Sequence, residues 1–232
     1  MWSPLRGAVG SAVALLTPDF RGAAGVPLGE VLPSLEVLAD DIARLLDQAR
    51  VDRAIVGGLS MGGYVTMAFA RRHRERLAGV VLADTKAGAD PEAGRANRLR
   101  IAEILESEGT SRVLVDEMMP TFTGSTTKAE RAGVAALVAD MVGSAAPASA
   151  AWWLRAMAAR PSSFETLRGL DLPALVIVGD EDATTPVAEA QAMVDALPDA
   201  RLAVIAKAGH YSAVEAPEEF AAALTEFADE IG

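Results

Sequence analysis

Ser60 is set among glycines, in the stretch G-G-L-S-M-G-G at residues 57–63. An apolar run of strand type, Arg53–Gly57, comes before it, and a helical pattern begins at Met61. A strand, a G-x-S-x-G turn and a helix in this order are typical of a bend that exposes a serine hydroxyl above a sheet. A glycine-rich turn that binds phosphate is the alternative, although the G-x-x-x-x-G-K-[ST] pattern is missing. The stretch therefore predicts a nucleophilic serine.

The glycines around Ser60 have a predicted steric role. A serine at a sharp strand-to-helix bend has strained backbone dihedrals, and side chains two positions away would be crowded. We therefore expect Gly58 and Gly62 to make room for the bend. The serine hydroxyl would lie at a helix N-terminus, which favours developing negative charge. The backbone N–H of Met61 would then donate to the oxyanion of a tetrahedral intermediate.

A serine hydroxyl needs a base to accept its proton. The chain has two histidines, His73 and His210. His73 lies on the helix that follows Ser60, roughly 20 Å away at about 1.5 Å per residue, so we expect it at a solvated helix end. His210 follows the strand-type run Arg201–Ile205, at the carboxyl end where ligands and catalytic groups of parallel sheets gather. His210 is the predicted general base, with a surface-loop histidine as the alternative.

An acidic residue is expected to orient the imidazole and compensate its charge. The segment G-D-E-D-A-T-T-P, residues 179–186, follows the strand-type run Ala174–Val178 at its carboxyl end. Asp182 is the first candidate and Asp180 the second. Asp84, which ends another such run, is the third. A solvated acidic loop is the alternative for the whole segment.

The elements that must position these residues alternate along the chain. Short runs rich in Val, Ile, Leu and Ala predict five strands: Ala12–Thr17, Arg53–Gly57, Gly79–Ala83, Ala174–Val178 and Arg201–Ile205. Helical patterns cover Leu35–Gln48, Met61–Arg72, Thr185–Leu197 and Pro217–Ile231. Continuous apolarity fits strands buried on both faces of a parallel sheet. The alternation predicts an α/β fold, a mostly parallel sheet flanked by helices.

Residues 87–163 interrupt this alternation. Three helical patterns follow one another there, with no good strand between them: residues 92–109, 127–143 and 148–160. We expect this part to be a helical cap over the ends of the strands. The α/β core would then consist of residues 1–86 and 164–232.

The order Ser60, Asp182, His210 is that of α/β-hydrolases, and the motifs around these residues resemble those of the α/β-hydrolase superfamily. The stretches similar to its nucleophile, acid and histidine motifs are G-G-L-S-M-G-G-Y, L-V-I-V-G-D-E-D-A-T-T-P and K-A-G-H-Y-S-A-V-E-A-P-E-E-F. T-P-D-F-R-G-A-A-G resembles a D-x-R-G-x-G segment that follows an early strand there. The resemblance covers nearly the whole chain and is closest to small capped carboxylesterases and enol-lactonases. It implies an α/β-hydrolase fold, Asp182 as the acid and Met61 as an oxyanion donor.

The sequence departs from the superfamily on its N-terminal side. Members usually have two or three more strands, and a His-Gly loop after the third supplies the second oxyanion N–H. No His-Gly dipeptide precedes Ser60, and residues 1–11 resemble the helix after that loop. Loss of one oxyanion donor costs about 3 kcal/mol of transition-state stabilisation. Three explanations stay open: a fragment or misplaced start, a first strand shifted into the gap, or a degenerate relative that binds rather than cleaves.

The composition limits the partners. The 232 residues include 21 Lys and Arg against 32 Asp and Glu, a net charge of −11, which argues against nucleic acid and anionic membranes. The chain has no cysteine, and two histidines are too few for imidazole-rich metal centres. No apolar run reaches the roughly 20 residues of a membrane span. Arg6–Leu16 resembles a short signal peptide with one basic residue, but a helix end that runs into a strand is the preferred interpretation. We therefore expect a cytoplasmic protein without metal or organic cofactor; a homo-oligomer stays open.

Together these features predict a serine hydrolase that cleaves a small ester, thioester or lactone through an acyl-enzyme. The small-molecule acyl substrate would lie under the cap, with Trp152, Trp153 and Tyr211 as candidate contacts, although helix packing explains the tryptophans equally well. Perhydrolase, C–C hydrolase or cyclase chemistry on the same fold is an alternative, because a triad does not fix the reaction. A non-catalytic binding protein is the other alternative.

Overall fold

The centre of the protein is a parallel β-sheet, seen in a computed structural model that describes residues 1–9 and 13–231. Within these residues the sheet has four strands in the order β1-β2-β3-β4, and every neighbouring pair is parallel. The strands are β1 (Ala54–Leu59), β2 (Leu77–Ala83), β3 (Ala174–Gly179) and β4 (Ala200–Ile205). Four of the five predicted strands are thus confirmed, with ends that differ by up to two residues.

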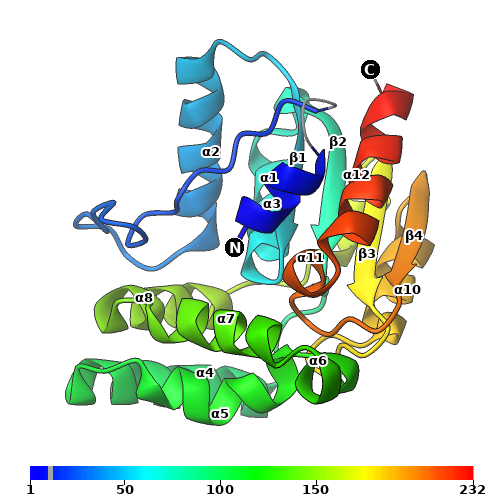
Figure 1. Cartoon of the computed structure of the whole chain (residues 1–232). Coiled ribbons are helices and arrows are strands. Elements are labelled where there is room, and N and C mark those ends of the chain that lie inside the picture. Colours follow the sequence, from blue (N-terminus) through cyan, green and yellow to red (C-terminus); the bar gives the residue numbers. More distant parts are fainter. Residues whose placement is uncertain (10–12, 232) are drawn as a thin grey trace.

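Helices cover both faces of the sheet, and the central strands are therefore apolar on both sides (Figure 1). Val80 and Leu82 of β2 pack into one cluster with the helices α2 (Leu35–Ala49), α3 (Met61–Arg72) and α10 (Val187–Ala196). Val81 of β2 and Ile177 of β3 point to the other face, because side chains alternate along a strand. The helices there are α1 (Ser3–Val9), α11 (Ser212–Glu215) and α12 (Pro217–Ile231).

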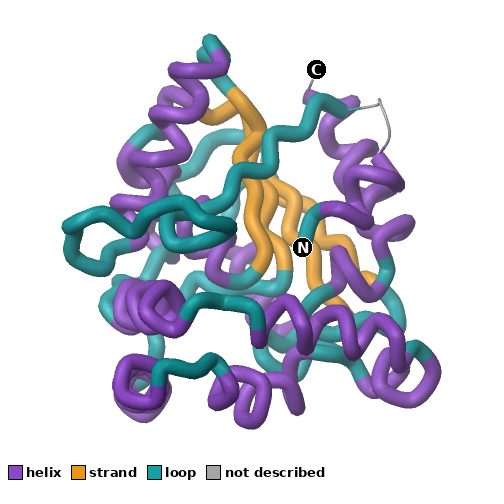
Figure 2. Tube along the Cα trace, turned by 60° about the vertical axis from the view of Figure 1, so that its left-hand side comes forward, coloured by secondary structure: helices purple, strands orange, loops and turns teal. Residues whose placement is uncertain are grey.

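A separate layer of helices lies across the carboxyl ends of the strands (Figures 1 and 2). It consists of α4 (Glu92–Glu108), α5 (Arg112–Phe122), α6 (Ser125–Glu130), α7 (Ala132–Gly143) and α8 (Pro147–Ala158). These helices bury a cluster of their own, including Ile101, Leu105 and Leu154. Two short elements, η1 (Arg74–Arg76) and α9 (Phe164–Arg168), lead into β2 and towards β3. We call the layer formed by α4–α8 the cap.

Two chain segments connect the cap to the sheet, and they are joined to each other. The backbone N–H of Ser163 donates to the carbonyl of Ala87 at 2.8 Å. Arg160 makes a bidentate ion pair with Asp90, with both N···O distances at 2.7 Å and both side chains buried. The Arg160 guanidinium also lies 3.9 Å from the ring centroid of Tyr64 in α3. These contacts fix the base of the cap against α3.

Two sequence expectations about the elements are wrong. Residues 13–17 form no strand, and Ala12 lies outside the described residues. β1 is therefore at the edge of the described sheet, so no shifted first strand fills the place beside it. An extended segment without a paired neighbour gains no ladder hydrogen bonds, which apolar composition alone does not reveal.

In the cap, α5 was not expected, and the expected helix over 127–143 is divided into α6 and α7 at Arg131.

Within the described residues, no single helix is long and apolar enough to cross a membrane. The pair α7 and α8 reaches that length and composition only together, and the two helices meet at a 90° bend.

Candidate active site

Ser60 occupies the bend between β1 and α3, as the sequence predicts. Its backbone has φ +54° and ψ −112°, a left-handed conformation that is strained for any residue but glycine. Two contacts with the end of β2 and the residues after it hold the bend: Ser60 N–H donates to the Ala83 carbonyl at 2.9 Å, and Thr85 Oγ1 donates to the Ser60 carbonyl at 2.9 Å. The hydroxyl is thereby presented at the carboxyl end of the sheet.

The glycines of this stretch differ in their roles. A Cβ on Gly58 would lie 2.1 Å from the carbonyl carbon of Gly62, so no side chain fits at position 58. A Cβ on Gly62 would meet nothing within 4 Å, so the expectation that Gly62 makes room for the bend is wrong. Gly57 and Gly63 are crowded too, because a Cβ there would lie 2.8 Å from Val81 Cβ and 2.5 Å from the Thr85 side chain, respectively. The bend is tight where the helix passes β1 and β2, and open at Gly62.

His210 reaches Ser60 from the other end of the chain. It lies between β4 and α11, and its Nε2 is 2.8 Å from Ser60 Oγ. The residue is 1% exposed, whereas Ser60 is partly exposed. His73 lies elsewhere, at the end of α3, with Nε2 2.7 Å from Asp40 Oδ1. It is partly buried and paired with this carboxylate, and so is less solvated than expected.

Asp182 is the acid that contacts the imidazole. Its Oδ2 is 2.8 Å from His210 Nδ1 and also accepts from Thr185 Oγ1 at 2.7 Å. Its Oδ1 accepts from the backbone N–H groups of Thr184 and Thr185. Burial would raise the pKa of Asp182, but the hydrogen bond and charge of His210 and the bonds from Thr185 outweigh it, so the pKa is below its usual range. The carboxylate is therefore ionised at neutral pH.

This arrangement determines the tautomer of the imidazole. An ionised carboxylate accepts hydrogen bonds only, so His210 Nδ1 carries the proton that it donates to Asp182. The lone pair of Nε2 then faces the hydroxyl of Ser60. A neutral His210 can accept the serine proton as Oγ attacks, and Asp182 stabilises the imidazolium that results.

The other two acid candidates lie outside this chain of contacts. Asp180 is exposed in the same loop. Asp84 is fully buried at the end of β2, and its carboxyl accepts hydrogen bonds from Gly179 and Ser212. Of the three candidates, the structure therefore brings only Asp182 to the imidazole.

The remaining predicted site residues are Met61, Tyr211, Trp152 and Trp153. Met61 is the first residue of α3, so its backbone N–H is one of the helix-opening groups without an acceptor within the helix. Tyr211 follows His210, with ring centroids 6.0 Å apart, and burial raises its pKa to about 12. Trp152 and Trp153 donate their indole N–H groups to the carbonyls of Val31 and Arg21. They join α8 to the loop before α2, and their contact with a substrate stays a prediction.

Sequence reasoning did not find the residues that attach the cap to the loops of Asp182 and His210. Glu215 is buried and accepts from the backbone N–H groups of Gly124 in the cap and of Tyr211. Glu181, beside Asp182, accepts from the backbone N–H and the hydroxyl of Thr126 in α6. These bonds lower the pKa of Glu181. The only available signal was proximity: Glu181 adjoins Asp182, and Glu215 follows His210 by five residues.

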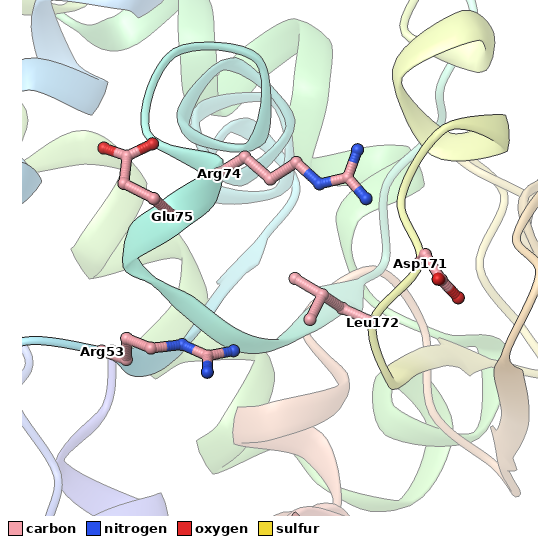
Figure 3. A pocket seen from close by; sticks show the side chains of 5 residues that line it. All are labelled: Arg53, Arg74, Glu75, Asp171 and Leu172. Carbon is pink, nitrogen blue, oxygen red and sulfur yellow. The ribbon is translucent and has the colours of Figure 1, made fainter.

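A hollow of about 430 Å³ lies at the opposite end of the sheet (Figure 3). Its lining comes from residues that precede strands β1 and β3 or lie in η1: Arg53, Arg74, Glu75, Asp171 and Leu172. The guanidinium of Arg53 donates hydrogen bonds to the carbonyl of Leu77. The hollow contains charges of both signs and is remote from Ser60, so it is not part of the candidate site.

A strained serine at a strand-to-helix bend, with a histidine and an acid from later strand ends, is the arrangement of α/β-fold hydrolases. Comparison with known proteins agrees: residues 1–223 match the model of the alpha/beta hydrolase family, and the chain belongs to this family. It is a hydrolase of the α/β fold.

The chain is similar to two solved structures and, in sequence, to one further relative. A thermophilic esterase from Thermogutta terrifontis has 35% sequence identity and a TM-score of 0.95, over 99% of this chain and 85% of that one. The enol-lactonase of Burkholderia xenovorans LB400 has 27% identity and a TM-score of 0.87, over 98% and 85%. In sequence, 3-oxoadipate enol-lactonase 2 of Acinetobacter baylyi is 28% identical over 86% of this chain and 72% of its own.

Proposed function

We propose that the protein is a serine hydrolase that cleaves a small carboxylic ester, thioester or lactone through an acyl-enzyme intermediate. One observation carries the proposal: His210 contacts Ser60 Oγ through Nε2 and Asp182 through Nδ1, each at 2.8 Å. A hydroxyl, an imidazole and a carboxylate in this order form a proton path that activates the oxygen as a nucleophile.

The reaction follows from the directions of these hydrogen bonds. Ser60 Oγ attacks the carbonyl carbon while its proton passes to His210 Nε2. The backbone N–H of Met61, at the start of α3, donates to the oxyanion of the tetrahedral intermediate. The imidazolium then protonates the leaving oxygen or sulfur, and the C–O or C–S bond breaks. Water, deprotonated by His210, attacks the acyl-serine and releases the carboxylic acid, which restores the serine hydroxyl.

The relatives support the substrate class. The solved neighbours with the highest similarity reported above are an esterase and an enol-lactonase, and both names denote carboxylic ester bonds, the second one in a ring. The cap lies over the candidate site and supplies buried apolar side chains at its edge. We therefore place the acyl group between the bend at Ser60 and the cap, with Tyr211, Trp152 and Trp153 as candidate contacts.

A fluorophosphonate probe tests the nucleophile directly, because it forms a covalent bond with an activated serine. We expect labelling of the full chain at Ser60, identified by peptide mass spectrometry, and loss of labelling in Ser60→Ala and His210→Ala. His73→Ala is the matched histidine control and should label at the wild-type rate. A folded wild-type protein that is not labelled would contradict the proposal.

A substrate series then distinguishes the bond types. p-Nitrophenyl esters of increasing acyl length, an acyl thioester and simple lactones are compared by kcat/KM. Hydrolysis of at least one of them, abolished in Ser60→Ala, is the expected result. The acyl length with the highest kcat/KM indicates the size of the acyl group that the site accepts.

A further inference from the structure

Asp84 is a buried carboxyl group that the proposed reaction does not use. It is 0% exposed and follows the last residue of β2. The hydrogen bonds to its side chain come from neutral groups: Gly179 N–H at 2.9 Å, Ser212 N–H at 3.2 Å and the Ser212 hydroxyl. Among the residues that the structure describes, no cation pairs with this carboxyl; such burial is costly, and it raises the pKa of Asp84 well above its usual range.

The groups that Asp84 contacts lie near Asp182 and His210, two of the three residues of the candidate triad. Gly179 ends β3, three residues before Asp182, and Ser212 comes two residues after His210. The backbone N–H of Asp84 also donates to the Ile177 carbonyl of β3 at 2.9 Å. One side chain therefore connects the loop of the acid with the loop of the base.

The residues on either side of Asp84 contact the third loop. The carbonyl of Ala83 accepts from Ser60 N–H, and the hydroxyl of Thr85 donates to the Ser60 carbonyl. Residues 83–85 thus contact the nucleophile bend, the acid loop and the histidine loop at once. The backbone of Asp84 has φ +42°, a left-handed conformation that Asp and Asn tolerate better than other non-glycine residues.

We propose that Asp84 is a positioning residue: its carboxyl fixes Ser212 and Gly179, and thereby sets the positions of His210 and Asp182 relative to Ser60. The proposal rests on the proposed function, because it concerns the same triad. Asp84 does not touch the imidazole or the serine; it acts through the backbone on both sides of the site. A displacement of about 1 Å in a catalytic group is enough to lower a rate about a hundredfold.

Two variants remove this connection in different ways. Asp84→Asn keeps the size and the left-handed backbone, but an amide offers one acceptor oxygen, whereas both carboxyl oxygens of Asp84 accept hydrogen bonds in the structure. It can accept from Gly179 and then presents an N–H to Ser212. Ser212→Ala removes the hydroxyl and leaves Asp84 in place. Ser111→Ala is the matched control, because Ser111 is also a buried serine and donates to the Ala145 carbonyl within the cap.

The first readout is independent of turnover. The chain has two histidines, so ring NMR of the ¹⁵N-labelled protein reports on His210 with little overlap, and His73→Gln assigns the other signal. We expect the Nδ1 proton signal of His210 to shift or to be lost through exchange in Asp84→Asn and Ser212→Ala. It should be unchanged in Ser111→Ala.

The second readout is steady-state hydrolysis of a p-nitrophenyl ester. We expect kcat to fall about 10- to 100-fold in both variants, with KM within about twofold of wild type. Unchanged His210 signals together with wild-type kcat, even at a lowered Tm, would overturn the proposal, since a purely structural role predicts that outcome. A wild-type protein without activity would instead contradict the proposed function, and the NMR comparison would still decide the role of Asp84.

Discussion

Phe122 of the cap stacks on the imidazole of His210, with ring centroids 5.4 Å apart and 25° between the ring planes. Phe122 is the last residue of α5 and is buried. The cap therefore contacts the predicted base directly and shields one face of its ring from water. Because Gly124, two residues further on, is bonded to Glu215, the same part of the cap is attached to the histidine loop.

Removal of the Phe122 ring should affect both stability and rate. Phe122→Ala is expected to lower the free energy of unfolding by about 3 kcal/mol, as is typical of a buried Phe→Ala change. It should also lower kcat, because the imidazole loses the surface that holds its ring plane. Urea denaturation and hydrolysis kinetics measure the two effects. Phe122→Leu keeps an apolar side chain over the imidazole, so it should retain more unfolding free energy and a higher kcat than Phe122→Ala. Equal kcat in wild type and both variants would contradict a role of Phe122 in holding the imidazole.

Asp182 and Asp180 form a matched pair for the identity of the acid. Asp182→Asn keeps the size but removes the charge that selects the His210 tautomer, so kcat should fall about 10⁴-fold. Asp180→Asn changes an exposed acid in the same loop and should leave kcat within about twofold of wild type. The ratio of the two kcat values is the measurement. A large effect at Asp180 with a small effect at Asp182 would exclude the proposed assignment.

Gly58 and Gly62 should respond very differently to the same added methyl group. Gly58→Ala places a Cβ at 2.1 Å from the Gly62 carbonyl carbon, and we expect a loss of about 3 kcal/mol or more of unfolding free energy. Gly62→Ala meets open space in the first turn of α3, and should stabilise the fold by up to about 1 kcal/mol. Urea denaturation of both variants checks the order. Similar midpoints would show that the bend is not sterically tight.

The Asp90–Arg160 pair predicts a pH-dependent contribution to stability. Burial would raise the pKa of Asp90, but the bonds and charges of Arg160 and Arg98 outweigh it and hold the pKa well below its usual range. Because the pKa of Asp90 is lower in the folded protein than in the unfolded chain, where it is near 4, the ionised carboxylate stabilises the fold above about pH 4. This contribution is lost as the pH falls through the folded-state pKa. Asp90→Asn should therefore cost about 3–5 kcal/mol at pH 7 and much less near pH 2.

Denaturation curves of wild type and Asp90→Asn between pH 2 and 8 measure this difference. The exposed acid Asp229 provides the control, since Asp229→Asn should give a small difference at every pH. A constant deficit of Asp90→Asn over the whole range would mean that the side chain acts through packing rather than through its charge.

Much of the fold could be predicted because its signals are local. Apolar runs such as Ala174–Val178 are buried on both sides, so they read as strands of a parallel sheet. The helices Met61–Arg72 and Pro217–Ile231 have the predicted bounds. The predicted strand at residues 13–17 is wrong for a physical reason: an apolar extended run becomes a strand only where a neighbouring strand supplies hydrogen bonds. α5 was missed because Pro120 lies inside it and hides its helical pattern.

The sequence by itself determined the types and order of the groups that carry chemistry. A serine in a glycine-rich bend, acids after one strand and a histidine after another are local patterns, and parallel strands bring their carboxyl ends to one edge. The tertiary structure decided which groups meet. Asp182 rather than Asp180 faces His210, Asp84 joins the two loops, and Phe122 covers the imidazole. Such contacts depend on the paths of loops and the directions of side chains, where differences of a few ångströms decide which groups meet. These details follow from packing between segments far apart in the chain.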